Sequence, residues 1–483
     1  MKKSLSLLLS AICTISALAQ TDIDAFRYSQ RSIAGTARFI SMGGAFGAIG
    51  GDLSAMSYNP AGLAIYRGSE FSISPSIYTG NTNADYLGGN TVSGRTVFNF
   101  GNIGLVLTNK DNDQSQVGWV NYNFGISYNR VADYNNASAI EGYNSSSSLL
   151  DYFAEKSKGV SYENLDAYNE YLAYYTYLIN PDSLNNYTSA APGGNLLQQR
   201  SCTTRGSMGE TNFTFSGNYQ NKLYLGATLS FATLNYTEES YFDGFDELNI
   251  LDSLRQFEYS QYVKTQGRGV NLKFGFIYRP TDYIRLGGAI HTPTWLNMSD
   301  SYSNYMAARF DGGYSDTKYS PDGAFDYNLT TPFRALASVA VLFGKAGLIS
   351  VDYEYSDISD ANFHAPGYGF SQVNADIRKK YQSTNSLRTG MEWRLSNVYF
   401  RGGYGFTTSP VQNKYAVSGF DFTQQHFSGG VGFRDKNYFL DLGYMYSISK
   451  EYFQPYTLEN TAVAGSDQRV NGYNATVTLG VKF

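Results

Sequence analysis

The sequence predicts an all-β protein, a 14-stranded antiparallel transmembrane β-barrel with an N-terminal hatch, or plug, segment. Three observations predict it: apolar and polar residues alternate in repeated segments, short and long connections alternate, and 16% of the 483 residues are aromatic. Only 16% are charged and the mean hydropathy is -0.33. That composition has too little charge for an ordinary soluble protein and is too polar for a bundle of transmembrane helices.

The first 19 residues predict a secretory signal peptide. Lys2 and Lys3 precede an apolar run, and Ala17-Leu18-Ala19 forms a small-residue cleavage site before Gln20. Losing both lysines takes the formal net charge from -5 to about -7, which argues against a nucleic-acid partner. Cys13 leaves with this peptide, so Cys202 is the only cysteine of the mature chain. We therefore expect no disulfide, no metal site and no cofactor.

Alternation is strictest in the last segment of the chain, where one face is entirely apolar and the other is polar or small. The apolar face carries Tyr473, Ala475, Val477, Leu479, Val481 and Phe483. A period of two is that of a strand with two different faces. The same pattern recurs in fourteen segments, which we predict as strands at 69–78, 94–108, 117–129, 207–219, 222–237, 257–279, 283–305, 325–343, 346–356, 382–395, 397–408, 423–434, 437–450 and 467–483.

Connection lengths favour lipid over a protein core as the environment of the apolar face. Tight turns such as 219–222 and 434–437 alternate with long polar loops such as 238–256 and 357–381. An up-and-down outer-membrane barrel sorts its connections in this way, with the short turns on the periplasmic side. We therefore expect the outer membrane of a Gram-negative bacterium, outer-membrane lipid as a partner, and interface aromatics at Trp393, Tyr399, Tyr444 and Tyr446.

Fourteen strands about 4.8 Å apart and tilted by about 40° give a barrel roughly 28 Å wide, too wide for wall side chains to fill. Residues 20–68 precede the first strand, lack strand alternation and are rich in small residues. We expect them to form the hatch inside a barrel of residues 69–483, with a large extracellular loop at 130–206. That loop has apolar residues at helical spacing from Leu165 to Ile179, which predicts an amphipathic helix.

The hatch segment carries the most specific motif. It reads Gly43-Gly44-Ala45 and then Asn59-Pro60-Ala61-Gly62. This pattern resembles the N-terminal hatch of the FadL family of outer-membrane transporters of long-chain fatty acids and other hydrophobic compounds. The resemblance implies a gate at Asn59, Pro60, Ala61 and Gly62, capture of ligand by surface loops, and lateral escape through a kinked wall strand. The terminal Phe483 is similar to the signal that the barrel-assembly machinery reads.

The second strand contains a change of phase. Phe98 and Phe100 share one face, whereas Ile103 and Leu105 take the other. One extra residue near Gly101-Asn102 explains the change, and a β-bulge is its simplest form. The bulge either marks an exit in the wall or only bends the strand.

Alternation places several charged residues and histidines on the inner face. The candidate ligand contacts among them are Lys273, Arg285, Arg388, Arg401 and His426. Charges of both signs on neighbouring strands can brace a polar lumen, and an arginine can also neutralise the carboxylate of an amphiphile. Both roles are compatible.

The sequence thus favours a transporter, not an enzyme, that takes up hydrophobic small molecules passively. A haem or porphyrin receptor is an alternative, because His291 and His426 face inward and could meet iron. An outer-membrane hydrolase is another alternative, but no sequence motif supplies a catalytic set around a histidine.

Overall fold

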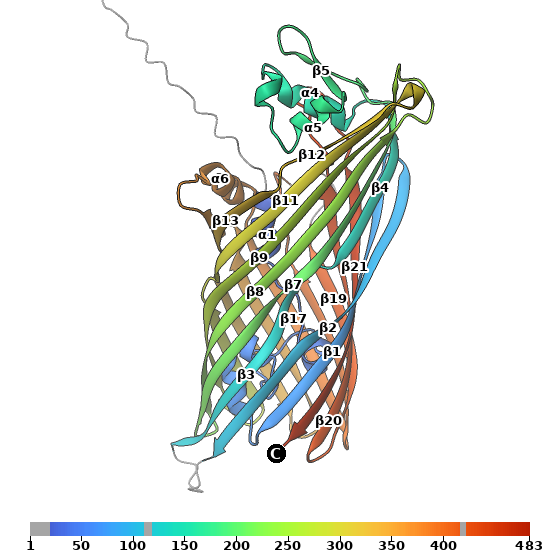
Figure 1. Ribbon diagram of the computed structural model, residues 1–483. Coiled ribbons are helices and arrows are strands. Elements are labelled where there is room, and N and C mark those ends of the chain that lie inside the picture. The colour runs from blue at the N-terminus through green and yellow to red at the C-terminus, as the bar shows by residue number, and fades with distance from the viewer. Residues whose placement is uncertain (1–19, 111–117, 416–421) are drawn as a thin grey trace, which may run out of the picture.

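The computed structural model describes residues 20–110, 118–415 and 422–483, so the predicted signal peptide at 1–19 lies outside the described residues. The chain forms a closed antiparallel barrel of fourteen strands, which confirms the predicted fold class (Figure 1). Two of the fourteen are each interrupted, one between β10 and β11 and the other between β13 and β14. The barrel strands are β1(Glu70–Tyr86), β2(Gly89–Lys110), β3(Trp119–Asp133), β7(Leu196–Tyr219), β8(Leu223–Phe245), β9(Leu254–Tyr278), β10(Ile284–His291) with β11(Trp295–Phe310), β13(Gly323–Thr330) with β14(Arg334–Phe343), β15(Gly347–Asp357), β17(Ser383–Leu395), β18(Val398–Thr407), β19(Gln424–Arg434), β20(Tyr438–Phe453) and β21(Ser466–Lys482).

Closure comes from the pairing of the first and last strands. β1 pairs with β2 on one edge and with β21 on the other, from Glu70↔Lys482 to Asp85↔Asp467. A closed cylinder leaves no open sheet edge in lipid, where an unpaired backbone group costs several kcal/mol. The remaining short strands are β4(Asn136–Asn144), β5(Ile179–Pro181), β6(Tyr187–Ser189), β12(Ser315–Tyr319) and β16(Asn362–His364).

Several strands extend beyond their predicted ends on the side of the long loops. β1 and β2 continue to a tight turn at Leu87-Gly88, and β7 begins at Leu196 where a loop was expected. The 25 residues of β9 span about 80 Å along the strand, far more than a membrane crossing needs. Apolar alternation marks only the lipid-facing stretch of a strand, so it does not detect the part that rises above the membrane with two polar faces.

Two neighbouring strands that were predicted as continuous are each broken at a proline. Pro293 separates β10 from β11, and Pro332 separates β13 from β14. Proline lacks the N–H that a ladder needs. The two breaks lie side by side, and the Thr331 amide donates to the Thr294 carbonyl while the Thr294 amide donates to the Thr331 hydroxyl at 3.0 Å. These bonds replace the interrupted ladder.

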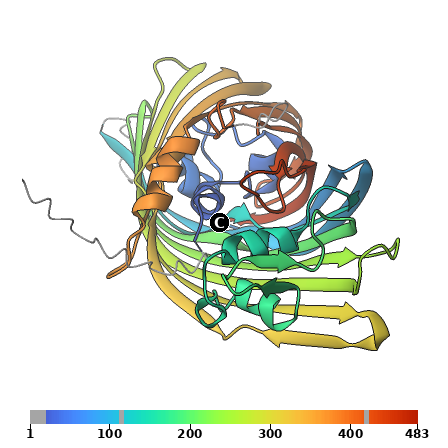
Figure 2. The same cartoon turned by 90° about the horizontal axis from the view of Figure 1, so that it is seen from above.

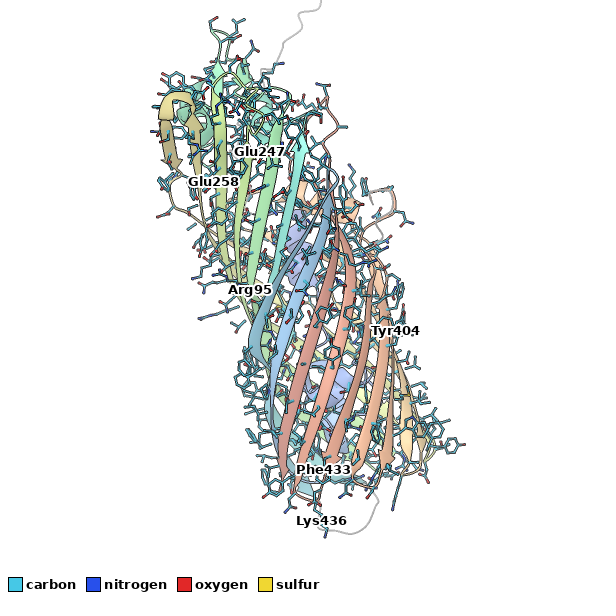
Figure 3. All side chains as sticks on the ribbon, turned by 90° about the vertical axis from the view of Figure 1, so that its right-hand side faces the viewer. Arg95, Glu247, Glu258, Tyr404, Phe433 and Lys436 are labelled. Atoms are coloured by element: carbon cyan, nitrogen blue, oxygen red, sulfur yellow. The ribbon has the colours of Figure 1, made fainter. Side chains whose placement is uncertain are left out.

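The outer surface of the barrel is apolar near the end that carries the short turns, which is the lower end in Figure 1. Phe274, Phe276, Leu440 and Leu442 are among the exposed side chains there. Figure 3 places Phe433 and Lys436 at the lower end, with Glu247 and Glu258 at the upper end. This division gives one end of the barrel a lipid-compatible surface and the other a polar one.

The predicted interface aromatics divide between the two faces of the wall. Trp393 and Tyr444 are exposed, and Trp393 stacks on Phe343 at 5.5 Å between ring centroids. Tyr399 does not belong to the outer set, because the guanidinium of the buried Arg401 lies 5.6 Å from the centre of its ring. Residues two positions apart in a strand point to the same face. Because the sequence pattern correctly placed Arg401 on the inner face, the same pattern implied an inward position for Tyr399.

The outer loop between β4 and β7 is a small folded unit above the barrel mouth. It contains α4(Leu149–Ser157), η2(Tyr162–Asn164) and α5(Glu170–Tyr175), so only a short part of the predicted helix is helical. Leu150, Phe153 and Leu172 are buried there against strand residues such as Phe257. η3(Asp311–Gly313) lies beside this unit, where Tyr314 packs against Tyr177 at 6.1 Å between ring centroids. η4(Ile358–Asp360) and α6(Ser371–Lys380) lie on the other side of the barrel mouth (Figure 1). No helix in the described ranges is long and apolar enough to cross a membrane.

The N-terminal segment lies inside the cylinder. Viewed from above, the blue segment is enclosed by the ring of strands (Figure 2). It consists of four short helices joined by glycine-rich turns: α1(Asp22–Ser29), α2(Ala37–Ser41), α3(Ala55–Tyr58) and η1(Pro60–Ile65). Residues 36–50 are all buried, which a segment outside an empty tube could not be. We call residues 20–66 the inner segment.

Wall glycines let the inner segment approach the strands closely. A Cβ added at Gly443 would lie 2.6 Å from the Ala37 carbonyl, and one at Gly287 would meet the Gly47 carbonyl. Both glycines face inward, so the wall and the inner segment meet backbone to backbone. Glycine inside a strand is typical of such an approach.

Replacing Gly430 by valine should therefore displace α2. A Cβ at Gly430 would collide with the Ser41 side chain, whereas one at the neighbouring Gly429 would have only ordinary contacts, the nearest at 3.7 Å. We expect Gly430→Val to lower the free energy of unfolding by about 1–3 kcal/mol through overpacking. The matched variant Gly429→Val should change it little. Denaturant unfolding in detergent, with proteolysis of the inner segment as a second readout, measures the difference, and equal effects of the two variants would contradict the close contact.

Candidate functional site: the inner segment and the lumen cavity

Arg38 of α2 fixes the lower part of the inner segment to the wall. Its guanidinium forms two hydrogen bonds with the Glu392 carboxylate on β17, at 2.8 and 2.9 Å. Glu392 also accepts from Arg401 at 2.6 Å, and Arg401 continues to Asp441 on β20 at 2.7 Å. Although burial lowers the pKa of Arg38, the Glu392 charge raises it above its ordinary value, so the pair stays ionised.

A second ionic cluster lies higher in the lumen. Arg31 of the inner segment pairs with Glu210 on β7 at 2.6 Å, and Lys273 on β9 takes the other carboxylate oxygen at 2.8 Å. His291 on β10 lies beside them, with Nδ1 3.4 Å from the Arg31 guanidinium and Nε2 2.7 Å from the Tyr58 carbonyl. Removing one member of such a buried cluster leaves its partners uncompensated, so the cluster fixes the segment at one height.

The Asn59-Pro60-Ala61-Gly62 turn is held against β8 and β9. The Asn59 side chain is buried and donates to the Gly47 carbonyl at 2.6 Å and to the Phe276 carbonyl of β9 at 3.2 Å. Its Oδ1 accepts from the Ala61 amide at 3.1 Å, which sets the turn that begins η1. Gly226 of β8 lies directly under Pro60. One asparagine therefore joins two parts of the inner segment and the wall.

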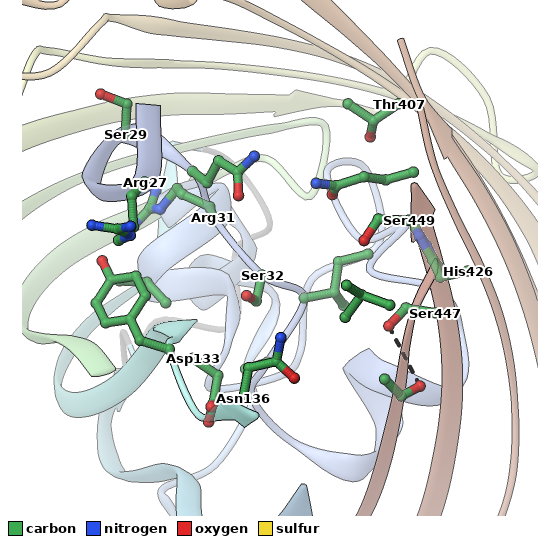
Figure 4. Close-up of a pocket in the computed structure, with 18 of the residues that line it drawn as sticks. Arg27, Ser29, Arg31, Ser32, Asp133, Asn136, Thr407, His426, Ser447 and Ser449 are labelled. Atoms are coloured by element: carbon green, nitrogen blue, oxygen red, sulfur yellow. Dashed lines mark hydrogen bonds between the residues drawn. The ribbon is translucent and has the colours of Figure 1, made fainter. Parts of the chain in front are cut away.

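A cavity of about 650 Å³ lies above these anchors, between the inner segment and the wall. The inner segment contributes apolar side chains to its lining, such as Phe26, Ile33 and Phe39, together with charged and polar ones such as Arg27 and Arg31. Met445 lies on the wall. Figure 4 shows Ser32 and Asn136 on one side of the space, with His426, Ser447 and Ser449 on the opposite wall. Its volume lies within the range of about 300–1,000 Å³ that is typical of small-molecule sites.

The five predicted ligand contacts all have protein partners. Lys273 is fully buried with Glu210, the Arg285 guanidinium donates to the Ile49 carbonyl at 2.8 Å, and Arg401 bridges Glu392 and Asp441. None of these three lines the cavity. Arg388, which pairs with Glu354, and His426, whose Nε2 is 3.2 Å from the Gly43 carbonyl, do line it. The structure thus brings two of the five to the cavity and uses the other three to hold the lumen together.

The lumen histidines are held by backbone carbonyls of the inner segment. His291 contacts the carbonyl of Tyr58 and His426 that of Gly43. Among residues 20–110, 118–415 and 422–483, no three His, Cys, Asp or Glu side chains come together as metal ligands. Both histidines are thus wall residues whose ring nitrogens contact the backbone of the inner segment.

The ladder between β2 and β3 is incomplete. It runs only from Asn102↔Asn129 to Lys110↔Asn121. Above it, β2 pairs with β1 alone, while β3 bends and β4 continues along β7. The bulge predicted in the second strand is confirmed at Gly101, the residue just above the last rung. We call the interruption between residues 99–101 and 130–135 the seam.

The upper hairpin of β1 and β2 covers the seam. Its inward-facing Thr91 hydroxyl donates to the Ala139 carbonyl, and the Ser93 hydroxyl donates to the Ala137 carbonyl of β4 at 3.2 Å. Hydroxyl groups of the hairpin therefore bind β4 carbonyls that the backbone N–H groups of a neighbouring strand would otherwise bind. The inner segment reaches the same place, because the Ser32 amide donates to the Val131 carbonyl at 2.8 Å. Asn99, Gly101 and Asn135 line the cavity, so the cavity meets the wall at the seam.

Two signals in the sequence could have indicated more of this site. Inward-phase glycines such as Gly287, Gly403 and Gly443 mark where another backbone approaches the wall. The seam is less visible, because β3 and β4 are separated only by Tyr134 and Asn135. The apolar and polar alternation of one strand does not show where that strand stops pairing with a neighbouring strand.

Fold and site together define a class: a fourteen-stranded barrel whose own N-terminal segment occupies the lumen beneath a small-molecule-sized cavity. Solved structures with this fold include the toluene transporter TodX of Pseudomonas putida, with a TM-score of 0.54, 14% identity, and coverage of 94% of this chain and 99% of that one. A FadL homologue of Pseudomonas aeruginosa has a TM-score of 0.56 and 11% identity, covering 94% and 99%. The toluene transporter TbuX of Ralstonia pickettii has 0.52 and 15%, with the same coverage. No protein-family model matches the chain, and no curated protein sequence matches it.

Proposed function

We propose that this protein is a FadL-type channel of the bacterial outer membrane that takes up hydrophobic small molecules by passive diffusion. The observation that carries the proposal is the cavity of about 650 Å³ between the inner segment and the wall, whose lining includes the apolar side chains of Phe26, Ile33 and Phe39. The apolar exterior of the lower barrel supports a place in lipid. Structures of the same fold are described as toluene transporters and a FadL homologue, which supports the same class of cargo.

In this proposal the seam is the exit. A ligand that leaves the cavity beside Gly101 passes between β2 and the bent end of β3 and enters the membrane without crossing the inner segment. Irregular backbone at membrane depth is tolerated where it lines a cavity, and the seam meets that condition. The protein then needs no energy source and acts as a channel, not an enzyme.

We also propose that the barrel-assembly machinery inserts the protein into the outer membrane. β21 ends at Lys482, and the exposed Phe483 that follows it donates its amide hydrogen to the Ser69 carbonyl at 3.0 Å. The C-terminal residue is thus accessible at the end of β21 and placed beside the start of β1.

Uptake by the protein in liposomes tests the function. Liposomes that contain the full chain should take up radiolabelled toluene or a short alkylbenzene faster than protein-free liposomes, and the initial rate should saturate with concentration. Heat-denatured protein controls for leakage caused by reconstitution. A rate equal to that of protein-free liposomes would refute the proposal.

The Asn59 turn should affect uptake more than folding. Replacing Asn59 and Pro60 by alanine removes the side-chain bonds to Gly47 and Phe276, which loosens the inner segment below the cavity. We expect uptake of the apolar probe to slow, while the barrel still migrates as a folded band in unheated electrophoresis samples. Asn221→Ala, at the periplasmic turn between β7 and β8, is the control. Normal uptake by the double variant would remove the gating role from this turn.

A further inference from the structure

The apolar band on the outside of β9 ends at Val270. Below it every second side chain faces outward, and Phe274, Phe276 and Tyr278 are all exposed. The stretch from Tyr278 to Arg268 spans roughly 33 Å along the strand, which is about 25 Å in height at a tilt of about 40°. That is the height of the apolar band on outer-membrane barrels. Arg268 therefore lies at the upper edge of the membrane, on the side of the long loops.

Aromatic side chains mark the same height on the two neighbouring strands. Trp295 begins β11, lies opposite Val270 and is 49% exposed. Phe231 of β8 lies opposite Val270 on the other side and is exposed as well. Tryptophan is enriched where the hydrocarbon core meets the lipid headgroups. The upper edge of the membrane thus crosses β8, β9 and β11 just below Arg268.

Three cations follow directly above this edge. Arg268 and Lys264 are exposed and have the same outward phase as the apolar side chains below them. In the described part of the chain, neither of the two forms an ion pair. Arg205 on β7 is also exposed and lies 3.4 Å from Glu239. Thr237 stands between Arg205 and Lys264 in the register. We call Arg205, Lys264 and Arg268 the basic patch.

The side chains beside the two unpaired cations are uncharged and can form hydrogen bonds. Their register neighbours on β8 and β11 are Thr233, Thr237, Asn297 and Ser301. Of the acids on the neighbouring strands, Glu239 is paired with Arg205, and Asp326 lies on β13, two strands away from β9. Arg268 and Lys264 are therefore available to an anion outside the barrel.

We infer that the basic patch binds the phosphorylated sugar headgroup of a glycolipid in the outer leaflet. Arg268 and Lys264 bind the phosphate, because a guanidinium group pairs its N–H groups with two phosphate oxygens and an ammonium adds a point charge. The neighbouring hydroxyl and amide side chains bind the sugar. The acyl chains lie on the apolar band directly below, which free phosphate cannot use. The inference concerns the outside of the barrel and does not depend on which cargo passes through the lumen.

Native mass spectrometry of the full chain in detergent measures this binding. The probes are lipid A with both phosphates, lipid A from which both phosphates have been removed, and inorganic phosphate. We expect the phosphorylated lipid A to bind at least about tenfold more tightly than the dephosphorylated one, and equimolar inorganic phosphate to displace neither. Equal binding of the two lipids would overturn the inference, and so would displacement by inorganic phosphate.

Variants of the patch test the two cations. Arg268→Gln combined with Lys264→Gln should weaken binding of phosphorylated lipid A at least about tenfold, since each cation near an anionic surface contributes about fivefold. The exchange Arg268→Lys with Lys264→Arg keeps both charges and should retain binding within about threefold. Arg309→Gln removes an exposed cation near the upper end of β11 and is the matched control. Unchanged binding in the double glutamine variant, or an equal loss in Arg309→Gln, would overturn the assignment.

Uptake is an independent readout of the same proteins. Arg268 and Lys264 do not line the lumen cavity, so the double glutamine variant should migrate as a folded band in unheated samples and take up toluene like the full chain. Loss of lipid A binding together with normal uptake supports the inference. If the full chain takes up toluene but binds both lipids equally, the proposed function stands and this inference fails.

Discussion

Deleting residues 20–62 should convert the barrel into an open pore. The inner segment occupies the lumen of a cylinder about 28 Å wide, and barrels only slightly wider hold an aqueous channel when nothing fills them. We expect the conductance of the reconstituted variant to rise by at least about an order of magnitude, together with leakage of small polar solutes. Planar-bilayer recording and liposome swelling measure the two effects.

The control for this deletion is removal of residues 182–186, the tip of the outer loop, where the Leu184 side chain is 76% exposed. That variant should conduct no more than the full chain. Circular dichroism and heat-dependent electrophoretic migration establish that both barrels are closed. If the folded deletion variant conducted no more than the full chain, the inner segment would not be the plug.

Linking the β1–β2 hairpin to β4 should abolish uptake through the seam. In a Cys202→Ser background, cysteines at Ser93 and Ala137 put one thiol on the hairpin and one on β4, at two residues whose hydroxyl and carbonyl oxygens lie 3.2 Å apart. A short thiol-reactive crosslinker then fixes the hairpin over the seam. We expect uptake of an apolar probe to fall to the protein-free rate and to recover when a cleavable linker is cut.

The matched control is a crosslink within the hairpin. Thr79 on β1 and Thr96 on β2 face each other, with their hydroxyls 2.9 Å apart. Joining cysteines at these positions stiffens the hairpin but does not attach it to β4, so uptake should continue. Full uptake with the Ser93–Ala137 link in place would place the exit elsewhere.

The bulge in β2 shows which features of the barrel wall a local sequence pattern can predict. The change of phase between Phe100 and Ile103 predicted an extra residue, and the register places it at Gly101. The sequence alone left open whether this bulge marks an exit or a bend. The β2–β3 ladder ends at Asn102↔Asn129, above which β3 leaves β2 but stays paired with β7. Only the folded chain shows this change of neighbour.

The charged residues of the lumen also show which features the sequence predicts and which depend on the folded chain. Alternation correctly placed Lys273, Arg388 and Arg401 on the inner face, because the side-chain period of a strand is local. Whether a ligand can bind them depends on partners on other strands, since Lys273 pairs with Glu210 on β7 and Arg388 with Glu354 on β15. A pattern along one strand carries no information about such partners.

The sequence by itself determined the strand number, the lipid-facing surface and the small-residue segment that precedes the barrel, since each follows from a local period or composition. The tertiary structure alone decided where the β2–β3 ladder ends and which charged side chains pair with one another. These properties arise from contacts between residues tens to hundreds of positions apart, such as Ser93 with Ala137 and Arg38 with Glu392, and such contacts exist only in the folded barrel.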